Sequence, residues 1–130
     1  MENTPELYHT LLSVLSQHSK WLDRRHRHTL AWMMVGLMSS KTVSLGAWVP
    51  FMVSRARYAQ SSVRRFRRWL DNHRIKPEPL YGPLIEQALI GWVGKRVYVA
   101  LDTSMLWNTY CLIRLSVIYR GRAVPIVWNC

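Results

Sequence analysis

Apolar residues in the first half of the chain recur at the spacing of α-helices. A leucine stripe over residues 7–15 predicts a first helix, which Thr4 can cap. The apolar positions over residues 30–37 predict a second and more deeply buried helix, and a basic stretch at 24–28 leads into it. A short third helix is expected over residues 44–48. The first half of the chain is therefore predicted to be helical.

The segment from Ser61 to Leu70 combines an apolar stripe with a basic one. At about 100° per residue, its apolar residues fall on one side of a helix and its four arginines fall on the other. Acidic residues do not alternate with these arginines, so ion pairs within the helix do not account for them. Two further arginines lie just upstream and can extend the same positive surface. The apolar side consists of Val63, Phe66, Trp69 and Leu70, and the basic set consists of Arg55, Arg57, Arg64, Arg65, Arg67 and Arg68.

After this helix the composition changes. Residues 71–83 contain three prolines and a glycine, which predicts a linker, and a short helix is expected over residues 84–90. From Lys95 onward the period becomes strand-like. The continuous apolar run 97–101 predicts a strand that is buried on both faces and ends at Asp102.

Two more strands are predicted near the end of the chain. Residues 111–119 alternate between apolar and polar side chains, which is typical of a strand with one core face. A tight turn is expected over residues 120–122, followed by a third strand over residues 123–128. Pro125 cannot donate a hydrogen bond, so the third strand belongs at a sheet edge. Helices followed by strands make the expected fold class α+β.

Composition and charge narrow the functions that this chain can have. The 130 residues hold 18 Lys and Arg against 7 Asp and Glu, for a formal net charge of +11. Hydrophobic residues make up 49% of the chain, which excludes a disordered polar tail. The seven acidic residues are scattered, so a site with several clustered carboxylates is not expected. The two cysteines, Cys111 and Cys130, form no framework of disulfides and fit a reducing cytoplasm.

The charge pattern predicts a polyanionic partner. Arginines that face outward from a docked helix neutralise phosphates, which favours nucleic acid. An anionic membrane surface is the alternative, but basic membrane helices need a broad exposed apolar face, and this helix uses its apolar stripe for packing. The apolar run 29–38 is about half of the ~20 residues that a membrane-spanning helix requires, so no membrane role is expected.

Two further features are candidates for chemical sites. His26 and His28 would diverge by about 200° on a helix, which does not suit a metal site. Asp102 directly follows an apolar run, where a buried carboxylate needs a partner or a metal ion. Asp102 can equally cap the turn into Thr103 and Ser104, and the pattern favours neither interpretation.

Two blocks of the chain resemble the DDE-type transposases of bacterial insertion sequences. YVALDTS at 98–104, followed by IRLSVIYRGRAVPIVW at 113–128, is similar to the start of their catalytic domain. SVRRFRRWLDN at 62–72 is similar to their helical DNA-binding domain. The resemblance implies a ribonuclease H-like fold with Asp102 as the first catalytic and metal-binding acid. Intact family members use Mg²⁺, but no acidic residue follows Asp102 here, so no stably bound metal ion is expected in this chain.

Together these observations define an expected organisation and function. A helical DNA-binding domain over 1–74 is expected to precede a linker with a short helix over 75–94 and the first three-stranded meander of a truncated ribonuclease H-like domain over 95–130. The expected function is binding of transposon ends in double-stranded DNA, without strand transfer by this chain alone. The alternative is a non-catalytic DNA-binding regulator derived from a transposase. The expected location is the bacterial cytoplasm, at the nucleoid.

The resemblance also leads to expectations about association. In a ribonuclease H-like sheet the first strand pairs with a fourth strand, which this chain lacks. Residues 95–130 are therefore expected to fold poorly alone and to promote self-association. A hetero-oligomer with an intact transposase is the other expected protein partner.

Overall fold

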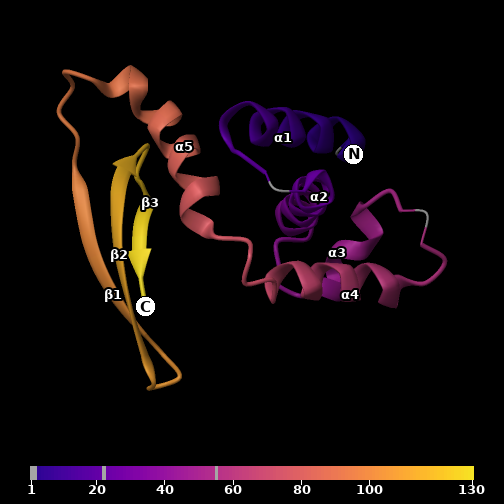
Figure 1. The fold of residues 1–130 in the computed structure, drawn as a ribbon. Helices are drawn as coiled ribbons and strands as arrows, with labels where there is room; N and C mark the ends of the chain where they lie inside the picture. The colour runs from indigo at the N-terminus through magenta and orange to yellow at the C-terminus, as the bar shows by residue number, and fades with distance from the viewer. Residues whose placement is uncertain (1–2, 22, 55) are drawn as a thin grey trace. The chain divides into compact units, whose positions relative to one another are not determined.

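The computed structural model describes residues 3–21, 23–54 and 56–130 as an α+β protein (Figure 1). The expected fold class is confirmed at this level. The helices are α1 (Thr4–His18), α2 (Arg24–Ser40), α3 (Leu45–Trp48), α4 (Ala59–Leu70) and α5 (Pro77–Leu89), with short 3₁₀ helices η1 (Val49–Phe51) and η2 (Ile90–Trp92). The strands β1 (Val99–Leu106), β2 (Tyr110–Tyr119) and β3 (Arg122–Asn129) form one antiparallel sheet in the order β1-β2-β3.

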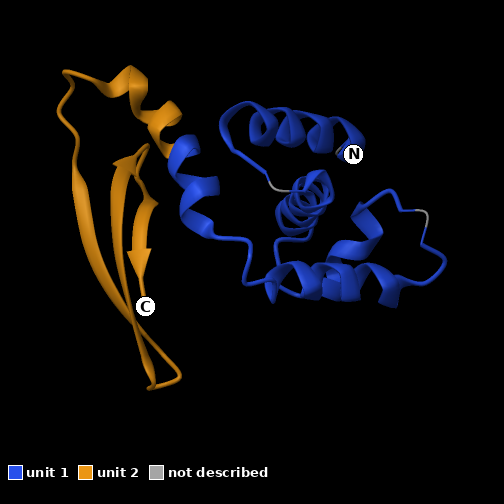
Figure 2. Ribbon diagram, in the orientation of Figure 1, with its two compact units in different colours: residues 1–84 blue, residues 85–130 orange. Residues whose placement is uncertain are grey.

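The chain divides into two compact units, residues 1–84 and residues 85–130 (Figure 2). The boundary falls inside α5, so this helix contributes residues to both units. The first unit is referred to below as the helical unit, and the second as the sheet unit.

The core of the helical unit surrounds α2. In Figure 1, α2 is seen end-on, with α1 on one side of it and α3 and α4 on the other. Residues from all of these helices contribute to a single cluster, because each helix turns its apolar stripe toward α2. The buried members of the cluster are Tyr8, Leu15, Ala31, Trp32, Met33, Val35, Trp48, Met52 and Phe66.

Side-chain caps set where the first two helices begin. The Asn3 side chain accepts a hydrogen bond from the Glu6 backbone N–H at 3.4 Å, so the cap of α1 is Asn3 rather than the expected Thr4. Asp23 caps α2 by accepting from the Arg25 N–H at 2.8 Å. The basic stretch at 24–28 is therefore the first turns of α2 itself. A carboxylate cap at this end is also favoured by the helix dipole.

The buried side of α4 follows the predicted periodicity, except that Ser62 is buried and Leu70 is exposed. Phe66 is 0% exposed and Ser62 is buried beside it, whereas Val63 and Trp69 are half-buried. Leu70, expected on the packed side, is 54% exposed. Leu70 lies at the last position of α4, whereas Ser62 is one helical turn before Phe66 on the same buried side.

The expected linker at 71–83 is partly helical. α5 begins at Pro77, where a missing N–H costs nothing in the first turn of a helix. Pro83 lies inside α5 and removes one backbone hydrogen bond there, but the helix continues to Leu89. The Ser19 hydroxyl donates to the Leu80 carbonyl at 2.7 Å, which ties the first half of α5 to the helical unit. The prediction of a helix beginning only at residue 84 was therefore wrong.

The sheet confirms the predicted edge position of the third strand. β3 lies at one edge of the sheet, and the register with β2 shifts between Leu115 and Ser116, opposite Pro125. Bulges and prolines occur at sheet edges because they interrupt the ladder of hydrogen bonds. The expected tight turn consists of Arg120 and Gly121, both with positive φ, as a two-residue hairpin requires.

The first strand differs from its prediction in length and burial. β1 continues through Asp102 to Leu106, and nearly all of its residues are exposed. The expected burial on both faces needs a strand in the middle of a covered sheet, but β1 lies at an edge next to β2 alone. The hairpin from β1 to β2 turns through Trp107 and Asn108, which both have positive φ.

Candidate nucleic-acid interface

Polar contacts hold α4 against the first turns of α2. The indole N–H of Trp69 donates to the His26 carbonyl at 2.8 Å. Nε of Arg65 donates to the Thr29 hydroxyl at 2.8 Å, and that hydroxyl donates to the Arg25 carbonyl at 2.9 Å. These contacts fix the orientation of α4 against α2.

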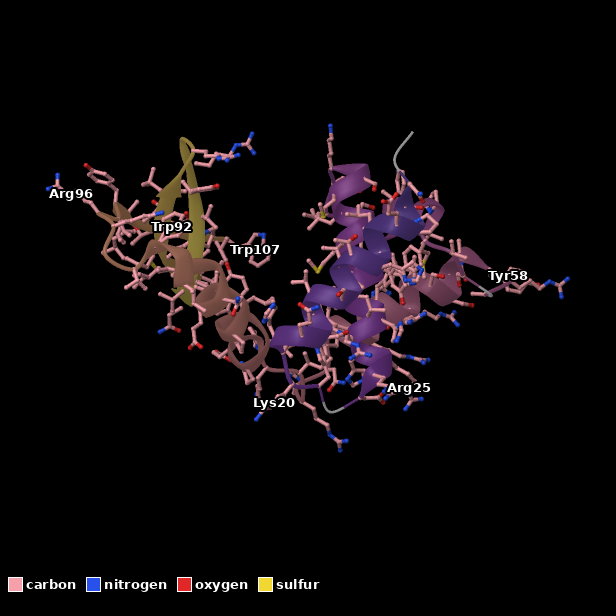
Figure 3. The ribbon with its side chains drawn as sticks, turned by 90° about the horizontal axis from the view of Figure 1, so that it is seen from above. Lys20, Arg25, Tyr58, Trp92, Arg96 and Trp107 are labelled. Atoms are coloured by element: carbon pink, nitrogen blue, oxygen red, sulfur yellow. The ribbon has the colours of Figure 1, made fainter. Side chains whose placement is uncertain are left out.

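A basic groove lies beside this contact, with a volume of about 660 Å³. Arg64, Arg65 and Arg68 line it from α4, and Arg25 lines it from the first turn of α2. Figure 3 shows Arg25 among the side chains that extend from the helical unit. Polar groups and one indole complete the lining, which consists of Arg25, His26, Thr29, Ser61, Arg64, Arg65, Arg68, Trp69 and Asn72. These nine residues are called the basic groove below.

The positive charge of the groove is largely uncompensated. Among the residues that the structure describes, the ion pairs are Arg25 with Asp23 at 2.9 Å and Arg114 with Asp102 at 2.8 Å. The arginines of α4 are therefore not paired with a carboxylate. Residues 1–84 contain 13 of the 18 Lys and Arg residues and 5 of the 7 Asp and Glu residues, so +8 of the formal net charge of +11 lies in the unit that contains the groove.

The pKa of His28 is affected by the positive charges of nearby arginines, including Arg65 of the groove. The Tyr8 hydroxyl hydrogen-bonds to Nδ1 of His28, and the Tyr8 ring stacks on Trp32 with centroids 4.1 Å apart. Burial lowers the pKa of His28, and the positive charges of Arg27, Arg65 and Arg24 lower it further. Burial raises the pKa of the Tyr8 hydroxyl, while Arg65 and Arg27 oppose this rise. His28 is therefore neutral near pH 7 and adds no positive charge to that of the arginines.

The lowered pKa of His28 predicts an acid-sensitive fold. The unfolded chain binds a proton at the usual histidine pKa of about 6.5, while the folded state resists protonation. His28 therefore costs no stability above that pH, and the free energy of unfolding falls as the pH decreases below it. His28→Gln should reduce this loss, as measured by urea denaturation at about pH 7.5 and about pH 5.5. The control is His73→Gln at an exposed histidine, and equal acid sensitivity in both variants would contradict the prediction.

The structure separates the arginines that the sequence grouped together. Arg64, Arg65 and Arg68 line the basic groove, but Arg67 does not. Arg57 is exposed, and its guanidinium lies 5.6 Å from the ring centroid of Tyr58. Arg55 lies outside the described residues.

Sequence reasoning missed the part of the groove that α2 contributes. The basic stretch at 24–28 is evident in the sequence, but its pattern indicated a lead into the helix rather than the helix itself. Arg25 and His26 lie in the first turn of α2 and line the groove. The Asp23 cap, followed by arginines, could have indicated this helix start.

Asp102 lies in the sheet unit and has a protein partner. Its carboxylate accepts a hydrogen bond from Arg114 on the neighbouring strand at 2.8 Å, and the Asp102 side chain is 54% exposed. Arg114 is directly opposite Asp102 in the register of the two strands. The described residues contain no group of three His, Cys, Asp or Glu side chains arranged to hold a metal ion. The charged neighbour that the structure gives Asp102 is therefore Arg114.

Comparison with known proteins found a similarity over a short stretch, and the matched protein is not a transposase. The chain is 35% identical over 57 residues to a component of a probable K(+)/H(+) antiporter from Rhizobium meliloti (strain 1021). The aligned part covers 41% of this chain and 6% of that protein. No family model matches the chain, and no solved structure matches it.

These comparisons contradict the resemblance to DDE-type transposases. The similarity that was found is to an antiporter component, and no match points to a transposase. The catalytic and metal-binding roles of Asp102 and the ribonuclease H-like fold were implied by that resemblance, and they lose their basis with it. In the described part of the chain, each helix is too short or too polar to cross a membrane. The interpretation of the basic groove is unaffected, because it is based on residues and geometry.

Proposed function

We propose that the helical unit binds the phosphate backbone of double-stranded DNA through the basic groove. The observation that supports this proposal is the convergence of Arg25, Arg64, Arg65 and Arg68 from two helices on one groove. Guanidinium groups suit phosphate because they offer several N–H donors in a planar fork. The same proposal takes the protein to be a non-catalytic DNA-binding protein of the cytoplasm.

The remaining groove residues fit the same ligand. Ser61 and Asn72 offer neutral hydrogen-bonding groups next to the arginines, as phosphate contacts in DNA-binding proteins do. Nε of Arg65 is used in the contact with Thr29, which leaves its two terminal nitrogens for a phosphate. Arg64 and Arg68 are one helical turn apart on the exposed side of α4, so they can contact successive phosphates.

The proposal predicts a defined dependence of DNA affinity on salt. The three unpaired arginines of α4, together with Arg25 if it exchanges Asp23 for a phosphate, give a slope of about −3 to −4 in a plot of log K against log salt concentration. Arg64→Ala combined with Arg68→Ala should make this slope shallower by about 2, because two contacts are lost. Arg65 is left unchanged in this test, since it also holds α4 against α2. Fluorescence anisotropy with a labelled duplex measures the slope.

A charge-matched variant separates the groove from general electrostatics. Arg57→Ala combined with Arg67→Ala removes two arginines of the same unit that lie outside the groove. We expect its slope to stay close to that of the unchanged protein. Equal losses in the two double variants would show that total charge matters and the groove does not. Binding to anionic lipid vesicles without binding to duplex DNA would overturn the proposal.

A further inference from the structure

The sheet has two outer strands, β1 and β3, and β1 has the regular edge. β1 has eight residues, contains no proline, and pairs with β2 on one side. In Figure 1, β1 lies on the side of the sheet away from β3. The other outer strand, β3, is interrupted by Pro125 and by a register shift opposite it. Prolines and bulges protect sheet edges against pairing with another chain, and β1 has neither.

The hydrogen-bonding phase of β1 can be read from one contact. The Ile118 N–H donates to the Tyr98 carbonyl at 2.9 Å, so these two residues form a hydrogen-bonded pair. In an antiparallel ladder such pairs recur at every second residue. Even-numbered residues of β1 therefore direct their backbone groups toward β2. The odd-numbered residues direct theirs to the open edge, and these are Val99, Leu101, Thr103 and Met105.

Three of the four side chains at these positions are apolar and exposed, and the fourth is Thr103. Leu101 is 71% exposed, Met105 is 62% exposed, and Val99 is also exposed. A strand with unpaired backbone donors and exposed apolar side chains gains stability when another strand is added to the edge.

We propose that this edge pairs with β1 of a second copy of the chain to form a two-fold symmetric dimer. The order of residues along β1 supports this choice of occupant. If the two strands run antiparallel and are centred on Thr103, Leu101 faces Met105 of the second copy and Asp102 faces Ser104 of the second copy. Residues of like polarity are then opposite each other at each position, and the two sheets become one sheet of six strands.

Charge disfavours the neighbouring register that is centred on Asp102. A pairing centred on Asp102 would place the two Asp102 carboxylates directly opposite each other, and like charges at such positions are destabilising. The register centred on Thr103 avoids this contact and leaves the ion pair of Asp102 with Arg114 intact. In this register Thr103 forms a hydrogen-bonded pair with Thr103 of the second copy. Leu101 and Met105 form such pairs with Met105 and Leu101 of the second copy.

Sedimentation equilibrium on the full chain tests the dimer. Nucleic acid is first removed with nuclease, and the experiment is run in about 0.5 M salt, where surface charges are strongly screened. The unchanged protein should form dimers with increasing concentration. Thr103→Lys places two positive charges opposite each other at the two-fold axis and should weaken dimerisation at least ~10-fold. Thr103→Val should preserve the dimer, because it keeps a β-branched residue at this position.

A lysine substitution on the other outer strand serves as the control, and a cysteine substitution tests the predicted pairing by disulfide cross-linking. Ala123→Lys on β3 should leave the dimer unchanged. With Cys111→Ser and Cys130→Ser as background, Thr103→Cys should form a disulfide-linked dimer on air oxidation, since paired Cα atoms about 5.5 Å apart suit a disulfide. Ala123→Cys in the same background should not. A monomer at all concentrations, or association that Thr103→Lys leaves intact, would overturn the proposal.

Discussion

Replacing Phe66 by alanine will destabilise the helical unit by about 3–5 kcal/mol. Phe66 is 0% exposed and packs against Trp48 in the middle of the core cluster, with ring centroids 5.9 Å apart. The loss combines the transfer of an aromatic ring out of the core with the cavity that it leaves. Small domains have only about 5–15 kcal/mol of stability, so this substitution removes a large part of it.

Urea denaturation followed by far-ultraviolet circular dichroism measures this effect. Phe66→Leu serves as the conservative control and should cost less than half as much, because most of the side-chain volume is kept. The DNA affinity of the Phe66→Ala variant should fall only in proportion to the unfolded fraction, since Phe66 does not line the basic groove. A free-energy loss below about 1 kcal/mol would contradict the packing of α4 described above.

The second large effect is expected at Gly36 in the middle of α2. A Cβ atom on Gly36 would lie 2.3 Å from Cβ of Trp48 and 2.7 Å from its Cγ. Trp48 cannot easily move away, because it is buried and its indole N–H donates to the Thr42 carbonyl at 2.7 Å. Gly36→Ala should therefore destabilise the protein by about 1–3 kcal/mol, as overpacking of a core does.

The sign of this result distinguishes packing from helix propensity. Alanine is favoured over glycine inside a helix by about 1 kcal/mol, so propensity alone predicts that Gly36→Ala stabilises the protein. Gly46→Ala in α3 is the matched control, because nothing lies within 4 Å of the added Cβ. That variant should be neutral or up to ~1 kcal/mol more stable. If Gly36→Ala behaves like Gly46→Ala, α2 and α3 are not in the close contact described here.

The helices show what periodicity can predict. The apolar stripe and the arginines of α4 followed directly from the sequence, because their angular positions depend on residue number alone. Periodicity does not show which neighbour a face meets, so Ser62 was missed and Leu70 was placed in the core. The basic groove could be predicted only on its α4 side for the same reason. Its other side depends on the docking of α2, which Thr29 and Trp69 fix through long-range hydrogen bonds.

The C-terminal half shows where local signals mislead. Prolines at 77, 79 and 83 are typical of a linker, but Pro77 and Pro79 lie in the first turn of α5, to which proline is well suited. The apolar run of the first strand predicted burial, although burial depends on what covers a strand and not on its composition. Pro125 was placed correctly at an edge because its missing N–H acts locally. The proposed role of Asp102 came from a family resemblance that the comparisons contradict.

The continuous α5 helix limits how this protein can be divided or recombined. Leu84 packs against the core of the helical unit, whereas Ile85, Ala88 and Leu89 line a hollow of about 290 Å³ in the sheet unit. Severing the chain anywhere within α5 would take contacts from one of the two units. The halves are therefore not interchangeable modules, and any insertion or fusion that is meant to keep both intact has to spare this helix.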